Sequence, residues 1–146
     1  MSPGIRAFGE ADLSACLALF DANCPRFFAP NERAEFVAYL RAHAGAYRLY
    51  ERDGRVIAGF GVALRGDRAR LNWIMVDPEA QGSGAGGAMI AATIASARAG
   101  GTRVIDIAAS HLSAPFFARH GARARRRIAD GWGPGMHRVD MELSLD

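Results

Sequence analysis

The most informative stretch of this 146-residue chain is Ile74-Met75-Val76-Asp77-Pro78-Glu79-Ala80-Gln81-Gly82-Ser83-Gly84-Ala85-Gly86-Gly87. The apolar run at residues 71–76 predicts a buried strand, and Pro78, which has no N–H group, ends it. The glycines that follow let backbone N–H groups approach a ligand without interference from a Cβ atom. From Ala88 the chain continues Ala-Met-Ile-Ala-Ala-Thr-Ile-Ala, which predicts a packed helix.

A strand, a glycine turn and a helix in this order predict an anion-binding site. The first N–H groups of a helix have no partner inside it, and the positive end of the helix dipole points the same way, so phosphate is the expected ligand. Residues 82–87 also fit the dinucleotide pattern GxGxxG, with Asp106 as the ribose-binding acid. A dinucleotide turn begins directly after its strand, however, whereas residues 77–81 intervene here. A dinucleotide and a ligand-free surface turn stay open as alternatives.

The same stretch resembles the acyl-CoA-binding signature of the GNAT superfamily of N-acetyltransferases. The family pattern of Gln or Arg, two residues, Gly, one residue, then Gly or Ala is met by Gln81, Gly84 and Gly86. The resemblance implies that backbone amides of the turn hold the coenzyme A pyrophosphate, and that the preceding strand pairs with the pantetheine arm. The cofactor residues implied in this stretch are Ile74, Met75, Val76, Gln81, Gly82, Ser83, Gly84, Ala85 and Gly86.

A second stretch, residues 110–122, resembles another landmark of the same family. Phe116-Phe117 and Gly121 match its aromatic pair and glycine, and Ser110 stands where many members carry an asparagine that contacts pantetheine. The resemblance therefore implies that Ser110, Phe116 and Phe117 contact the cofactor. Many members have a tyrosine at the position of Phe117 that protonates the departing thiolate, which phenylalanine cannot do. Either the thiolate leaves with help from water only, another residue serves, or the chain binds acyl-CoA without catalysis.

The resemblance implies an α/β (α+β) fold with a splayed, mixed, mostly antiparallel sheet of about six or seven strands and about four helices. Helical spacing of Leu13, Cys16 and Phe20 predicts a first helix, with Asp12 as its cap. A second helix, capped by Asn31, precedes a meander of strands at residues 47–51, 55–64 and 68–76. A buried strand follows at residues 104–108, and a hairpin forms from residues 125–129 and 137–145.

The length predicts one domain over residues 1–146. No apolar run approaches the roughly 18 residues that cross a bilayer, and the first residues lack the apolar core of a signal peptide, so a cytoplasmic protein is expected. No His/Cys cluster has the spacing of zinc ligands, so no metal is expected. Cys16 falls on the apolar face of its helix, which favours a core residue over a nucleophile.

Most of the residues expected to contact the amine substrate lie in loops rather than in strands. Phe27 and Phe28 lie between the first two helices, where GNAT folds commonly line the acceptor pocket, although a role in capping the core is equally open. The other expected substrate contacts are Asn72 on the strand before the glycine turn, Trp132 in the glycine-rich loop, and His137 beside that loop. His111 is the candidate catalytic base, because it follows the buried strand next to Ser110 and titrates in a useful range.

The predicted activity is transfer of an acetyl group from acetyl-CoA to a primary amine of a small molecule or peptide. Direct attack is expected, because no Ser/His/Asp triad or cysteine nucleophile is evident. A non-catalytic acyl-CoA-binding regulatory module is the alternative. Nucleic-acid binding by the basic cluster at residues 123–127 is not expected, since no aromatic residues interleave it, and neither is membrane binding. A homodimer is left open.

Overall fold

The computed structural model describes residues 4–145, which form one seven-stranded sheet in the order β1-β2-β3-β4-β5-β7-β6. The strands are β1 (Gly4–Ala7), β2 (Tyr47–Arg52), β3 (Arg55–Arg65), β4 (Arg68–Val76), β5 (Val104–Ser110), β6 (Arg123–Gly133) and β7 (Met136–Ser144). The helices are α1 (Leu13–Ala22), α2 (Glu32–Ala42), α3 (Ala85–Ala99) and α4 (Ala114–Arg119). Short 3-10 turns lie just before α1 (Glu10–Asp12), after α2 (Ala44–Ala46) and between β4 and α3 (Pro78–Ala80). The predicted fold class, a mixed and mostly antiparallel sheet with four helices, is confirmed.

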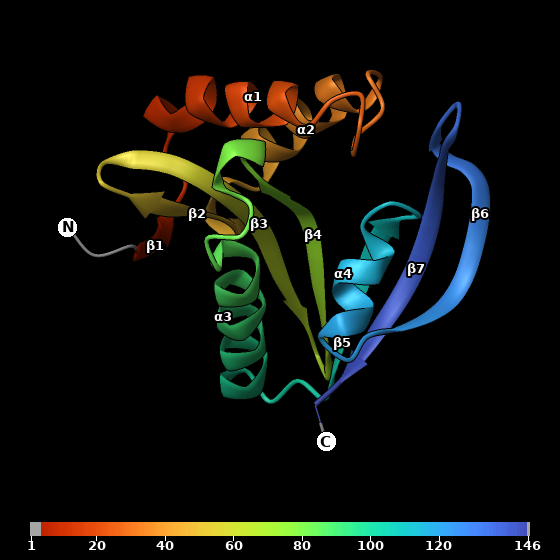
Figure 1. Cartoon of the computed structure of the whole chain (residues 1–146). Coiled ribbons are helices and arrows are strands. Elements are labelled where there is room, and N and C mark those ends of the chain that lie inside the picture. The colour runs from red at the N-terminus through yellow and green to blue at the C-terminus, as the bar shows by residue number, and fades with distance from the viewer. Residues whose placement is uncertain (1–3, 146) are drawn as a thin grey trace.

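The sheet is splayed at its only parallel strand pair within residues 4–145. β4 pairs with β5 from Arg68 opposite Val104 to Leu71 opposite Ile107, and the pairing stops there. Figure 1 shows the two strands side by side at the end of the sheet nearest the C-terminus and apart at the other end. The second half of β4 and the end of β5 therefore face each other across a gap, with backbone N–H and C=O groups that lack a strand partner on that side.

Helices cover both faces of the sheet and create two cores. On one face, α3 and α4 pack on apolar side chains of β3, β4, β5 and β7, including Phe60, Leu71 and Ile107. On the other face, α1 and α2 pack on β2 and the end of β4 through a mostly aromatic cluster around Phe36 and Tyr47 (Figure 1). On β4, Leu71 faces the α3/α4 side and Met75 faces the α1/α2 side. Regular alternation would put both on one face, so an irregularity lies between them.

That irregularity is a bulge at Trp73, beside the gap. Gly61 lies opposite Asn72 while Gly59 lies opposite Met75, so Trp73 and Ile74 together occupy the place of one residue. Trp73 has a positive φ of 50°, and its carbonyl accepts a hydrogen bond from the Tyr47 hydroxyl at 2.8 Å. The indole ring packs against Phe28, Phe36 and Tyr39, with ring centroids 5.0–6.0 Å apart. Aromatic packing thus fixes the unusual backbone of β4 where the sheet opens.

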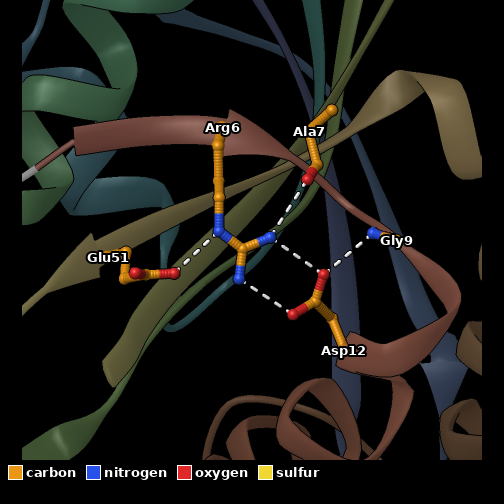
Figure 2. Close-up of polar contacts among 5 residues, drawn as sticks. All are labelled: Arg6, Ala7, Gly9, Asp12 and Glu51. Atoms are coloured by element: carbon orange, nitrogen blue, oxygen red, sulfur yellow. Dashed lines mark hydrogen bonds and ion pairs between the residues drawn. The ribbon is translucent and has the colours of Figure 1, made fainter. Parts of the chain in front are cut away.

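The start of the chain is held by an ion-pair network rather than by the predicted helix cap (Figure 2). The Asp12 side chain makes no cap hydrogen bond to α1; it accepts the Gly9 N–H at 2.8 Å and so closes the 3-10 turn before the helix. The two Asp12 carboxylate oxygens also accept hydrogen bonds from the two terminal nitrogens of Arg6. The Nε of Arg6 donates to Glu51 on β2. This pairing lowers the pKa of Asp12 and ties β1, β2 and the first turn together.

Three further findings bear on a membrane span, on Cys16 and on a metal site. No helix among the described residues is long and apolar enough to cross a membrane. Cys16 is fully buried, and burial raises the pKa of its thiol to about 12, which agrees with a core residue. In the part of the chain that the structure describes, no group of three His, Cys, Asp or Glu side chains is arranged to hold a metal ion.

Candidate active site

A cavity of about 800 Å³ occupies the gap between β4 and β5 and continues to both faces of the sheet. Residues from the glycine turn, both edges of the gap, α4, the α1–α2 connection and the β6–β7 hairpin line it. They are Asn23, Arg26, Phe27, Phe28, Glu32, Arg70, Asn72, Trp73, Ile74, Met75, Val76, Ala80, Gln81, Gly82, Gly84, Ala85, Gly86, Gly87, Ala108, Ser110, Leu112, Ser113, Pro115, Phe116, Phe117, Arg119 and Trp132. A cavity through the sheet can hold one substrate on each side.

The glycine turn forms the α3/α4 side of this cavity and leads directly into α3. Gly84 precedes the first residue of α3 and has a φ of 88°, a left-handed conformation in which a β-branched residue is strained. The N–H groups of the first turn of α3 therefore face the cavity, where Gly84, Ala85, Gly86 and Gly87 all line the wall. The positive end of the dipole of α3, a helix of 15 residues, lies at the same wall of the cavity.

Gly86 also has a packing role that the sequence pattern does not reveal. A Cβ atom at this position would lie 2.9 Å from the Phe116 ring of α4. The glycine therefore lets α4 approach the start of α3 closely. Phe116 and Phe117 line the cavity together, and Phe117 is almost completely buried in the core between sheet and helices. The two stretches identified separately in the sequence thus meet at one wall.

Of the predicted cofactor residues, all but Ser83 line the cavity. The Ser83 hydroxyl accepts the Ala85 N–H at 3.4 Å, and the Ser83 carbonyl accepts a bond from Arg52, so this residue shapes the turn. Ser110 does line the cavity, but its hydroxyl oxygen accepts the N–H groups of Leu112 and Ser113. Its first role is therefore to hold the turn that leads into α4.

The α1/α2 side of the cavity is lined by Asn23, Arg26, Phe27, Phe28, Glu32, Arg70, Asn72 and Trp132, which we call the acceptor compartment. The predicted substrate residues Phe27, Phe28, Asn72 and Trp132 all belong to it. Phe28 also stacks on Trp73 at 6.0 Å, so it both lines the compartment and caps the aromatic core.

Contacts between the α1–α2 connection and the β6–β7 hairpin close the compartment. Asn31 was expected to cap α2, but its side chain makes no cap bond; its Nδ2 instead donates to the Trp132 carbonyl at 2.9 Å. The Trp132 indole N–H donates to the carbonyl of Ala109 on β5 at 2.9 Å, and Arg138 covers its ring. The segment expected as a loop extends β6 to Gly133, so Trp132 projects from a strand end rather than from a free loop.

Glu32 is the acidic side chain of the acceptor compartment, and it is 3 % exposed. Its Oε2 accepts the Ala29 N–H at 2.8 Å, and no hydrogen bond within residues 4–145 engages Oε1. Burial raises the pKa of Glu32 to about 7, although the bond from Ala29 opposes the shift. A carboxyl with this pKa exchanges its proton near neutral pH, which is the property of a general base.

The raised pKa predicts a pH-dependent stability. The ordinary pKa is 4.5, so between 4.5 and about 7 the folded chain holds a proton that the unfolded chain has released. Stability contributed by this group is complete below 4.5 and falls as pH rises toward 7, by about 3 kcal/mol at most. We expect Glu32→Gln to raise the free energy of unfolding by up to that amount at about pH 8 and by almost nothing at about pH 4.

Denaturant unfolding at both pH values measures this difference. Glu10→Gln, which removes an exposed carboxyl outside the cavity, is the control and should show no pH-dependent gain. Equal stability of Glu32→Gln and the wild type at both pH values would refute the buried, protonated carboxyl.

The structure does not bring the two predicted histidines into the cavity. The Nδ1 atom of His111 accepts the His137 N–H at 3.2 Å, and His111 lines a separate shallow depression beside α4 and β6. The Nδ1 atom of His137 accepts the N–H of Asp130 in the hairpin. His111 comes directly after β5 and His137 lies at the start of β7, and their rings lie against each other with centroids 4.8 Å apart. The geometry gives no support to His111 as the base or to His137 as a substrate contact.

Sequence reasoning missed Glu32, Arg26, Arg70 and Asn23. In the sequence, Glu32 resembles any acidic residue in the first turn of a helix, where its interaction with the helix dipole is a sufficient reason for its presence. Arg70 resembles a solvent-facing residue of a strand, and only the splaying of β4 from β5 opens a cavity beside it.

A splayed sheet, a glycine turn at a helix N-terminus and a cavity joining both faces define the class of GNAT-type acetyltransferases. The chain belongs to the Acetyltransferase (GNAT) family, whose sequence model matches residues 15–122. Among curated proteins, no sequence matches the chain.

Solved structures agree on the fold over essentially the whole chain. Ard1 from Thermoplasma volcanium superposes with a TM-score of 0.83 at 14% identity, covering 100% of this chain and 99% of that one. The ribosomal-protein-S18-alanine N-acetyltransferase from Escherichia coli gives 0.80 at 16% identity, over 99% and 95% of the two chains. The structure of yncA from Salmonella typhimurium with its cofactor acetyl-CoA gives 0.71 at 18% identity, over 100% and 95%.

Proposed function

We propose that this protein transfers an acetyl group from acetyl-CoA to a primary amine of a small molecule or peptide. One observation carries the proposal: a single cavity joins the glycine turn on one side of the sheet to the buried carboxyl of Glu32 on the other. The structural relatives support it, because one is described with acetyl-CoA and another as an N-acetyltransferase.

The chain supplies binding and alignment for this reaction. Backbone N–H groups of Gly82, Gly84, Gly86 and Gly87 hold the pyrophosphate. The unpaired edge of β4 at residues 72–76 holds the pantetheine arm as a further strand would. An N–H group beside the Trp73 bulge polarises the thioester carbonyl. Holding amine and thioester in line is worth about 7–11 kcal/mol in ideal cases, so alignment supplies most of the rate.

Glu32 is the proton acceptor in this mechanism. The amine nitrogen attacks the thioester carbonyl carbon, the C–S bond breaks, and the proton lost by the nitrogen passes to the Glu32 carboxylate directly or through one water molecule. Phe117 has no proton to give, so the thiolate leaves as such and takes its proton from water; a thiol pKa of about 8.5 makes it a fair leaving group. No group on the chain is acylated.

Thiol-release kinetics test the proposal. Purified protein is mixed with acetyl-CoA and a panel of amines, amino acids and peptides, and free thiol is followed with and without each acceptor. We expect acceptor-dependent release with an equal amount of acetylated amine. Tight binding of acetyl-CoA without release for any acceptor would favour the alternative, a non-catalytic acyl-CoA-binding module.

The placement of His111 gives a further prediction. Because its ring lies outside the cavity and bonds to the His137 backbone, His111→Ala should change kcat by less than about threefold. Steady-state kinetics with the best acceptor measure this. A loss of about 100-fold, with the fold intact by circular dichroism, would return the role of base to His111.

A further inference from the structure

The acceptor compartment contains two arginines besides Glu32. Arg26 is exposed and lies over the Phe27 ring, whereas Arg70 is partly buried, and its surroundings point to a substrate group of opposite sign. Arg70 and Asn72 lie on the face of β4 opposite Leu71, which packs against the α3/α4 core. Arg70 is therefore on the acceptor side of the sheet, near the point where β4 and β5 separate. It is partly buried, whereas Arg68, two residues earlier on the same face, is exposed.

The acidic side chains near Arg70 on this face of the sheet form ion pairs with other arginines. Arg68 bonds to Asp106 and Glu142, Arg125 also pairs with Glu142, and Arg138 pairs with Asp140. The Arg70 side chain, in contrast, forms no ion pair or hydrogen bond with any residue in the range 4–145 that the structure describes. A guanidinium on a cavity wall with no carboxylate beside it can bind a ligand carboxylate through two parallel N–H groups.

The compartment thus has two poles. Glu32 and Arg70 supply opposite charges to its lining, and Phe27, Phe28 and Trp132 supply apolar surface. Resting on the proposed acetyl transfer, we infer that the acceptor is an amine that also carries a carboxylate, namely an α-amino acid with an apolar side chain, whose carboxylate Arg70 binds. A peptide N-terminus has an amide at that place and does not satisfy Arg70.

Paired acceptors test this inference. L-Phenylalanine, L-leucine and L-methionine are each compared with their α-carboxamides, which keep the amine and side chain but remove the negative charge. We expect wild-type protein to prefer each acid over its amide by about 10–100-fold in kcat/KM, since hydrogen bonds to charged groups contribute about 1.5–3 kcal/mol. Arg70→Gln should remove this preference by losing activity on the acids while keeping its activity on the amides.

Arg65→Gln, at the exposed end of β3 outside the cavity, makes the same charge change and should retain the preference. Equal use of acid and amide by wild-type protein, or an unchanged preference in Arg70→Gln, would overturn the inference while leaving acetyl transfer intact.

A binding measurement separates this inference from the proposed function. Calorimetry in the presence of coenzyme A compares N-acetyl-L-phenylalanine with N-acetyl-L-phenylalaninamide. Selective binding of the carboxylate form, lost in Arg70→Gln, would support the site even if no acceptor released thiol. Equal affinity for the carboxylate and the carboxamide would contradict the inference, whether or not the protein turns over any acceptor.

Discussion

Gly84→Val is expected to lower the affinity for acetyl-CoA by about 100-fold or more. Gly84 has a φ of 88° at the start of α3, and its position lines the cavity. A valine there strains the turn and turns N–H groups away from the phosphates, and each lost charge-assisted hydrogen bond costs about 1.5–3 kcal/mol. Isothermal titration with acetyl-CoA measures the effect directly.

Gly66→Val separates lost binding from lost stability. Gly66 lies in the turn between β3 and β4, has a φ of 63°, and, like Gly84, has no atom within 4 Å of an added Cβ. Both substitutions should destabilise the fold by a similar amount, about 1–3 kcal/mol, because both place a branched residue in a left-handed conformation. Only Gly84→Val should lose acetyl-CoA; equal affinity in the two folded variants would remove the glycine turn from the binding site.

Glu32→Gln is expected to lower kcat by about 100-fold or more, the usual contribution of a general base. The amide keeps the size of the carboxyl and can accept the Ala29 N–H, so the start of α2 should stay folded. Because only the ionised carboxylate accepts a proton, wild-type activity should rise with pH up to about 7, the pKa of buried Glu32, and this rise should be absent in the variant. A pH series of kcat on one acceptor shows both effects.

Glu35→Gln is the matched control on the same helix. Its carboxylate is exposed and lies outside the cavity, so the substitution should leave kcat within about twofold of wild type. An undiminished kcat in Glu32→Gln, with the pH dependence preserved, would show that another group or water accepts the proton.

The sequence predicted the glycine turn on the cavity wall because this turn depends on local backbone chemistry. Glycines, a strand-ending proline and an apolar helix occupy adjacent positions, so the spacing of Gln81, Gly84 and Gly86 contains the whole pattern. The same holds for the aromatic pair on α4. The contact between Gly86 and Phe116 connects two stretches that are far apart in sequence, and neither stretch alone indicates it.

The acceptor side could be predicted only in part, because it forms from residues that four separate elements bring together. The aromatic residues Phe27, Phe28 and Trp132 were predicted from their place in loops. Burial distinguishes Glu32 from the exposed Glu35 of the same helix, and the sequence has no local signal for this difference. His111 and His137 were chosen by type and position along the chain, but the β5–β7 pairing directs their rings toward each other.

A crystal structure with acetyl-CoA would test the central claim most directly. We predict the pyrophosphate on the N–H groups of Gly82, Gly84, Gly86 and Gly87 and the pantetheine arm along the unpaired edge of β4. The thioester should lie beside Trp73 with its acetyl group directed toward Glu32. A cofactor bound elsewhere, with the glycine turn and the gap between β4 and β5 empty, would contradict the account.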